Sequence, residues 1–147
     1  MSDAATHLRV LLDAGQTIEL RVDGTSMRPW LRAGERVTVA RRPIRFGDLI
    51  AYPRDGGIVV HRVIGRHGDA WRVQGDGTRR REPTVDDPLG RVIAVDGRHR
   101  FGLGPERRLI ALLSRSGLLR PVLALVVKLR PRRATDLEPT DAKDPTS

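Results

Sequence analysis

Cysteine is absent from this chain of 147 residues, which excludes disulfide bonds, cysteine nucleophiles and cysteine-based zinc sites. The four histidines show no metal-ligand spacing, so we expect neither a metal nor any other cofactor. Lysine is scarce as well: Lys128 and Lys143 are the only two, and both follow the part of the chain expected to form a β-core. A lysine therefore cannot serve as a base within that core.

Aromatic residues number only five, too few to supply a platform on which nucleotide bases stack. A small basic β-domain for RNA is thus a weak alternative, and we expect no nucleic acid as a partner. The apolar run 122–127 is far too short to span a bilayer. The N-terminal segment lacks a basic region followed by a long apolar run, so it does not resemble a signal peptide. Together with the absence of cysteine, this predicts a cytoplasmic protein.

The positive charge is concentrated in one segment. The net charge of the chain is +9, and residues 97–133 hold ten basic residues against one acid, which by itself amounts to +9. Such a block predicts an anionic partner. Because the basic residues accompany leucine- and valine-rich stretches, an anionic membrane surface suits them better than nucleic acid, with the protein peripheral to that membrane. The alternative is that these stretches simply pack on the rest of the fold.

Hydrophobic periodicity predicts a mainly β domain. A short helix is expected over 4–14, where leucine and valine recur without a helix breaker until Gly15. Six short strand-like stretches follow, separated by glycine, proline and aspartate, and they predict a compact sandwich or barrel-like domain. These stretches are 17–23, 36–40, 48–52, 57–64, 70–74 and 90–95.

The chain changes character after about residue 104. Leucines at helical spacing predict one short helix over 105–116, and Pro121 is suited to the first turn of a second one that reaches residue 130. The final polar, proline-rich residues 134–147 predict a disordered tail. We therefore divide the chain into a β-domain (1–104), a basic helical segment (105–133) and this tail.

One short stretch, 23–30 (DGTSMRPW), interrupts the strand-like pattern. It places Ser26 between Gly24 and Pro29, in a sequence that either forms an ordinary turn or presents a nucleophile at one. Gly24 permits a tight turn, and Pro29 restricts the direction in which the chain leaves it. Met27 is expected to anchor the turn in the core.

A serine is a poor nucleophile until a base removes its proton, and His61 is the candidate base. It lies within an expected strand, on the same side as Val59 and Val63. A histidine between apolar neighbours is more often a hydrogen-bonded core residue, so its position alone does not indicate catalysis.

An acid that orients the histidine has several candidate positions. Asp76 lies in a Gly-Asp-Gly turn, and Asp86 and Asp87 precede a proline. Without a catalytic role, Asp76 would be a turn residue that bonds its own backbone, and the other two would be loop residues. The residues by themselves leave these alternatives open.

The order of five short motifs is more specific than any one of them. Along the chain they are GTSMRP, AGERVTV, FGDLIAY, VVHRVI and VQGD. This order resembles the signal peptidase and LexA-type serine peptidase superfamily over about residues 18–95. Most bacterial signal peptidases and the LexA-type proteins carry a lysine base, whereas His61 stands here in VVHRVI. That is similar to the Ser-His signal peptidases of the endoplasmic reticulum and archaeal type.

The resemblance implies a signal-peptidase-like β-domain in which Ser26 is the nucleophile, His61 is the base and an aspartate completes the site. Asp76 matches the Gly-Asp of the family's acidic box, and Asp86 or Asp87 matches its later acid. The two asparagines of that box are replaced here by glycine and threonine.

The resemblance also implies an oxyanion hole at the same turn. The backbone N–H of Ser26 would be one donor to the developing oxyanion. Lysine-type relatives have a helpful hydroxyl at the position that Gly24 occupies here, and the neighbouring Thr25 is the candidate substitute.

From this we expect a serine endopeptidase that uses a Ser-His dyad or Ser-His-Asp triad to cleave an extended segment of a peptide or protein. The alternative is a non-catalytic module on the same fold that docks to a peptide or a membrane.

Overall fold

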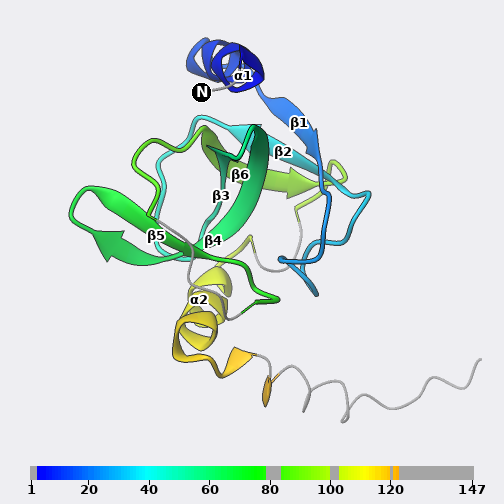
Figure 1. The fold of residues 1–147 in the computed structure, drawn as a ribbon. Coiled ribbons are helices and arrows are strands. Elements are labelled where there is room, and N and C mark those ends of the chain that lie inside the picture. Colours follow the sequence, from blue (N-terminus) through cyan, green and yellow to red (C-terminus); the bar gives the residue numbers. More distant parts are fainter. Residues whose placement is uncertain (1–2, 79–83, 100–102, 120, 123–147) are drawn as a thin grey trace, which may run out of the picture.

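The computed structural model describes residues 3–78, 84–99, 103–119 and 121–122, and it forms a small antiparallel β-domain with a helix at each end (Figure 1). The elements in chain order are α1 (Asp3–Asp13), β1 (Ile18–Arg21), β2 (Arg36–Ala40), β3 (Leu49–Arg54), β4 (Gly57–His67), β5 (Ala70–Gln74), β6 (Gly90–Val95) and α2 (Arg107–Ser116). The predicted mainly β fold is confirmed, and each of the six expected strands is present.

All six strands belong to one antiparallel sheet, in the order β1-β2-β6-β3-β4-β5. The strands therefore do not separate into the two stacked sheets of a sandwich, and no pairing of the described strands joins β1 to β5. β4 continues to His67, three residues beyond the prediction, because its second half pairs with β5.

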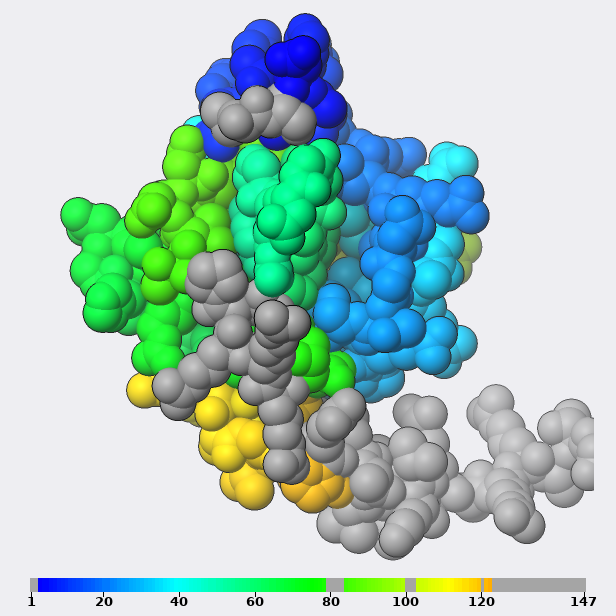
Figure 2. Space-filling model, viewed as in Figure 1, coloured from blue at the N-terminus to red at the C-terminus, as the bar shows by residue number. Residues whose placement is uncertain are grey.

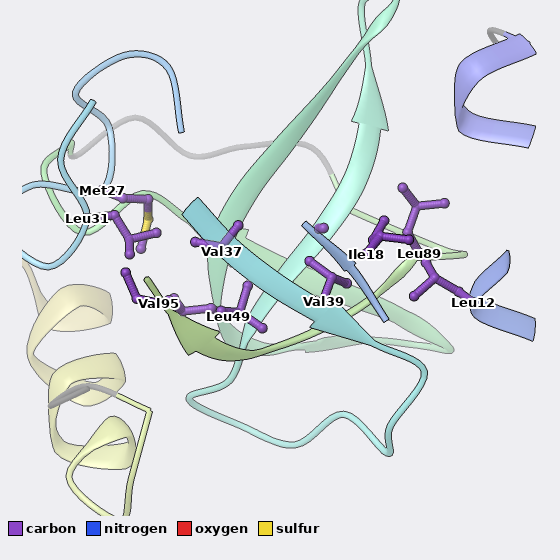
Figure 3. Close-up of a cluster of buried hydrophobic side chains, with 11 residues drawn as sticks. Leu12, Ile18, Met27, Leu31, Val37, Val39, Leu49, Leu89 and Val95 are labelled. Atoms are coloured by element: carbon purple, nitrogen blue, oxygen red, sulfur yellow. The ribbon is translucent and has the colours of Figure 1, made fainter. Parts of the chain in front are cut away.

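Apolar side chains are buried on both faces of this sheet. One cluster extends from Leu12 of α1 to Met27 and Leu31 in the turn after β1 (Figure 3). A second cluster lies on the opposite face and includes Val63 and Val73. Adjacent residues of β3 serve both clusters, because successive side chains of a strand point to opposite faces.

A two-residue turn sets the register of the β3–β4 hairpin. Asp55 and Gly56 both have positive φ, at 49° and 79°, as a type I′ hairpin turn requires. This turn places Ile50 opposite His61 and Tyr52 opposite Val59. His61 and Tyr52 therefore lie on the same face of neighbouring strands.

α2 lies at the end of the domain opposite α1 (Figures 1 and 2). Its first turn approaches β3 closely: a Cβ on Gly47 would lie 2.8 Å from the Arg107 carbonyl oxygen, and Arg107 Nε lies 2.9 Å from Asp48 Oδ1. Gly117 ends the helix with a positive φ of 75°. The second expected C-terminal helix lies almost wholly outside the described residues, and so does the expected tail.

Within the described ranges, no helix combines the length and apolar character that crossing a bilayer requires.

Candidate active site

Ser26 lies in the turn that follows β1, and buried neighbours hold this turn in place. Met27 and Leu31 are only 3% and 1% exposed, which confirms Met27 as an anchor. The Arg28 backbone N–H donates to the Thr25 carbonyl, and the Leu31 N–H donates to the Met27 carbonyl. Ser26 itself is half-buried, so its hydroxyl is held by a fixed turn and remains accessible.

His61 brings its ring to this hydroxyl from β4, 35 residues further along the chain. Its Nε2 lies 3.2 Å from Ser26 Oγ, at the outer end of ordinary hydrogen-bond distances. The residue is 2% exposed and shares a face with Val63, as its position in the strand predicts. The structure thus places the expected nucleophile and base within hydrogen-bond distance.

The other ring nitrogen of His61 faces Tyr52, which the sequence analysis did not identify as a site residue. Tyr52 Oη lies 2.9 Å from His61 Nδ1, and the tyrosine is 3% exposed. For Nε2 to accept the Ser26 proton, Nδ1 must carry a proton and donate it to the tyrosine oxygen. The Asp55-Gly56 pair in the sequence could have predicted this neighbour. A two-residue hairpin turn at that pair fixes the register of β3 against β4, and so fixes which β3 side chains lie beside His61.

Asp76 does not contact His61 but forms a buried ion pair with Arg62. The Arg62 guanidinium donates to both carboxylate oxygens over distances of 2.7–3.0 Å, and both side chains are fully buried. Arg62 Nη1 also donates to the Gly47 carbonyl, 2.8 Å away. All hydrogen bonds of Asp76 to the described residues go to Arg62.

Burial is the largest influence on the pKa of the Asp76 carboxyl. It raises the pKa of Asp76, because a charged group loses its hydration inside the fold, while the charge and hydrogen bonds of Arg62 oppose this rise. A buried ion pair with this desolvation cost contributes little net stability but fixes the groups that form it. The pair holds the Gly-Asp-Gly turn against β4.

The Gly-Asp-Gly turn contacts the backbone of Ser26. The Gly77 N–H donates to the Ser26 carbonyl oxygen at 2.7 Å. A Cβ on Gly75 would lie 2.6 Å from that same oxygen and 3.1 Å from Ser26 Cβ. Only glycine permits this approach. Asp76 therefore acts on Ser26 through the backbone of its turn rather than on the histidine.

Asp87, the other candidate acid, lies at the α1 end of the domain. Its carboxylate contacts Arg9 of α1 at 2.6 Å and reaches Arg41 at 4.0 Å. The Asp87 side chain is 67% exposed, and its hydrogen bonds and ion pairs with the described residues involve these two arginines. Asp86 is exposed as well. None of the three candidate acids hydrogen-bonds His61 within the described part of the chain.

The predicted oxyanion donors, the Ser26 N–H and Thr25, both belong to the turn after β1. Among the described residues, the Ser26 N–H donates to no other group, and the Ser26 carbonyl accepts from Gly77. Thr25 is exposed, and its carbonyl is the acceptor for Arg28.

A groove of about 160 Å³ begins at Ser26. One wall is the segment 20–24, and the other is Ile58–Val60 of β4, with Met27 and Val37 between them. The two walls lie side by side on the face shown in Figure 2, where the β3–β4 hairpin is teal and the segment after β1 is blue. The lining combines apolar side chains from both walls with polar groups such as Arg21 and Asp23.

Both walls present strand edges to this groove. β1 is an edge strand of the sheet, and β4 pairs with β5 only from Arg62 onward. The backbone of Ile58–Val60 thus pairs with β3 on one side and has no described strand on the other. An extended peptide can add to such an edge by main-chain hydrogen bonds.

Neither the models of known protein families nor the curated proteins match this chain.

Proposed function

We propose that this chain is a serine endopeptidase of the Ser-His signal-peptidase type. The observation that carries the proposal is the 3.2 Å separation of Ser26 Oγ and His61 Nε2, at the end of a groove bordered by strand edges. Covalent catalysis by serine needs a hydroxyl within reach of a base, and a third group that holds the base in position. Ser26, His61 and Tyr52 have this arrangement. The order of the sequence motifs supports the same conclusion independently.

In the proposed reaction, Ser26 Oγ attacks the carbonyl carbon of the substrate peptide bond while His61 Nε2 takes the hydroxyl proton. The Ser26 N–H, with Thr25 beside it, stabilises the oxyanion that forms. His61 then gives the proton to the departing amine, which leaves an ester on Ser26. A water molecule attacks that ester with His61 again as base, which releases the carboxylic acid product and restores the serine hydroxyl.

Tyr52 takes the position that an aspartate holds in a catalytic triad. As a neutral partner it fixes the ring of His61 and its tautomer, and it stabilises the imidazolium less than a carboxylate does. The proposal therefore corresponds to a Ser-His dyad with a tyrosine as a positioning residue. Asp76 is assigned the structural task of holding the Gly-Asp-Gly turn, and Asp87 is assigned no part in catalysis.

The groove suggests the class of substrate. Its walls can accept an extended peptide as an added strand, and the resemblance to signal peptidases suggests small residues next to the cleaved bond. We thus propose an extended segment of a peptide or protein with small residues before the cut. The cytoplasmic location expected from the sequence is part of the proposal and is supported by the lack of cysteine.

Labelling of the intact chain with a fluorophosphonate that reacts with activated serines tests the proposal without knowledge of the substrate. Ser26→Ala should abolish labelling, and His61→Ala should lower its rate by about 10³-fold or more, because the two residues act as a unit. Ser116→Ala is the matched control, since Ser116 is an exposed serine on α2 whose hydroxyl bonds only the Leu113 carbonyl.

Labelling that persists in Ser26→Ala, or full labelling of His61→Ala, would contradict the proposal. No labelling of the unmodified chain, together with binding of extended peptides in the groove, would favour the non-catalytic docking module instead.

A further inference from the structure

α2 presents leucines to solvent although the helix is firmly attached to the domain. Leu109 is 60% exposed and Leu112 is 53% exposed, whereas Ile110 and Ala111 on the other side are buried. Leu118, just after the helix, is 54% exposed. The helix that carries Leu109 and Leu112 lies at the end of the molecule opposite α1 (Figures 1 and 2). We refer to Leu109, Leu112 and Leu118 as the leucine face.

Two exposed arginines lie beside this face, and neither has an acidic partner in the part of the chain that the structure describes. Arg108 and Arg115 are exposed and are seven residues apart, which places them two turns apart on one row of the helix next to Leu112. Neither side chain forms a hydrogen bond or ion pair within the described residues. The sequence contains no acid from residue 107 to residue 133, so nothing in this segment neutralises the pair.

We propose that the leucine face docks on an anionic membrane surface. The leucines would enter the boundary between headgroups and acyl chains, while Arg108 and Arg115 extend to the headgroup phosphates. The charge of the segment favours a membrane as the partner, because a net charge of +9 between residues 97 and 133 is attracted to a surface of negatively charged headgroups. Nucleic acid would use the arginines but would leave the leucines exposed to water.

Contacts with the domain keep the leucine face in a fixed orientation. Arg107 pairs with Asp48 at 2.9 Å. The Gln74 side-chain amide donates to the Ser114 carbonyl at 3.4 Å and to the Thr78 carbonyl at 2.9 Å, and so connects α2 to the turn that supports Ser26. If the proposed peptidase function holds, docking through α2 would place this catalytic end near the lipid and favour substrates at the membrane.

Co-sedimentation of the full chain with vesicles tests the proposal. We expect binding to phosphatidylcholine vesicles that contain phosphatidylserine, weaker binding at high salt and little binding to phosphatidylcholine alone. Leu109→Ser with Leu112→Ser should lower the partition coefficient by about tenfold or more. Val10→Ser is the matched control, because Val10 of α1 is 63% exposed and lies at the opposite end of the molecule.

Arg108→Gln with Arg115→Gln should weaken binding to the anionic vesicles by roughly fivefold per arginine. Arg32→Gln with Arg42→Gln removes the same charge from exposed positions elsewhere and should have a much smaller effect. Ser26→Ala should bind vesicles like the unmodified chain, so this test and that of the peptidase proposal are independent.

Equal binding to neutral and anionic vesicles, or none to either, would overturn the proposal. An equal loss of vesicle binding in the α2 variants and in their control variants would also overturn it. A dimer in sedimentation analysis that the double serine variant dissociates would instead make the leucine face a contact between two copies of the chain, and this too would overturn membrane docking.

Discussion

Replacement of Gly75 by alanine tests whether the Gly-Asp-Gly turn fixes the position of Ser26. The added Cβ would lie 2.6 Å from the Ser26 carbonyl oxygen and 3.1 Å from Ser26 Cβ. Gly75 does not have the left-handed backbone conformation that disfavours other residues, so alanine adds a steric contact without backbone strain. The contacted atoms belong to the backbone and Cβ of Ser26, so a side-chain rotation cannot relieve the contact.

The structure gives the size of the expected effect. Ordinary contact begins at 3.4 Å, so the two turns must separate by about 0.8 Å. Ser26 Oγ and His61 Nε2 are already 3.2 Å apart, and a shift of that size away from the histidine breaks their hydrogen bond. Misplacement of a reacting group by about 1 Å costs on the order of 10²-fold in rate.

We therefore expect the fluorophosphonate labelling rate of Gly75→Ala to fall by about 10²-fold. Overpacking should also lower the free energy of unfolding by about 1–3 kcal/mol, which leaves a folded protein for the assay. Gly65→Ala is the control, because a Cβ there would meet only Arg72 Cδ at 4.0 Å. Labelling of Gly75→Ala at the unmodified rate, with the fold intact, would refute the idea that this turn positions Ser26.

Three other substitutions test the roles assigned to Tyr52, Asp76 and Asp87. Tyr52→Phe should lower the labelling rate by about five- to tenfold, the value of one neutral hydrogen bond, and should change the nitrogen-15 NMR shifts that report the His61 tautomer; unchanged shifts would argue against a positioning role. Arg62→Met removes the charge that holds down the pKa of Asp76, so this pKa should rise further and unfolding in urea at pH 7 should cost about 3–5 kcal/mol less. A carboxyl whose pKa is higher in the folded than in the unfolded chain favours folding at low pH, and this stabilisation is lost as the pH rises. The loss of stability caused by Arg62→Met should therefore be smaller at pH ~4 than at pH 7. A loss of stability that does not depend on pH would contradict this account. Asp87→Asn weakens the ion pairs of a carboxylate that is 67% exposed and should change the free energy of unfolding by about 1 kcal/mol or less and labelling not at all, whereas a large loss of labelling would restore Asp87 as a catalytic candidate.

Local patterns were sufficient to predict the elements of this fold. The strands at 36–40, 70–74 and 90–95 were predicted with the bounds that the structure has, because short stretches rich in β-branched and apolar residues are bounded there by glycine, proline or aspartate. The turn around Ser26 was predictable for a similar reason: a glycine, a proline and a buried methionine act within a few residues of one another.

The histidine was predictable as a partner of Ser26 only through the order of the motifs. Nothing local in VVHRVI shows which side chain lies 3.2 Å from His61 Nε2. That contact joins residues 35 positions apart, and it depends on how the turn after β1 packs beside β4. The prediction of His61 as the partner of Ser26 therefore rested on a resemblance in motif order and not on periodicity.

What the sequence by itself determined, then, is a mainly β domain with a serine at a tight turn, a histidine in a strand and a basic C-terminal segment, since these follow from neighbouring residues. Only the tertiary structure decided the partners. Tyr52 lies beside His61 because of the hairpin register, and Asp76 pairs with Arg62 because both are buried where β4 meets the Gly-Asp-Gly turn. Hydrogen bonds between distant residues depend on distances of a few tenths of an ångström, which are set when the strands pair and leave no periodic trace in the chain.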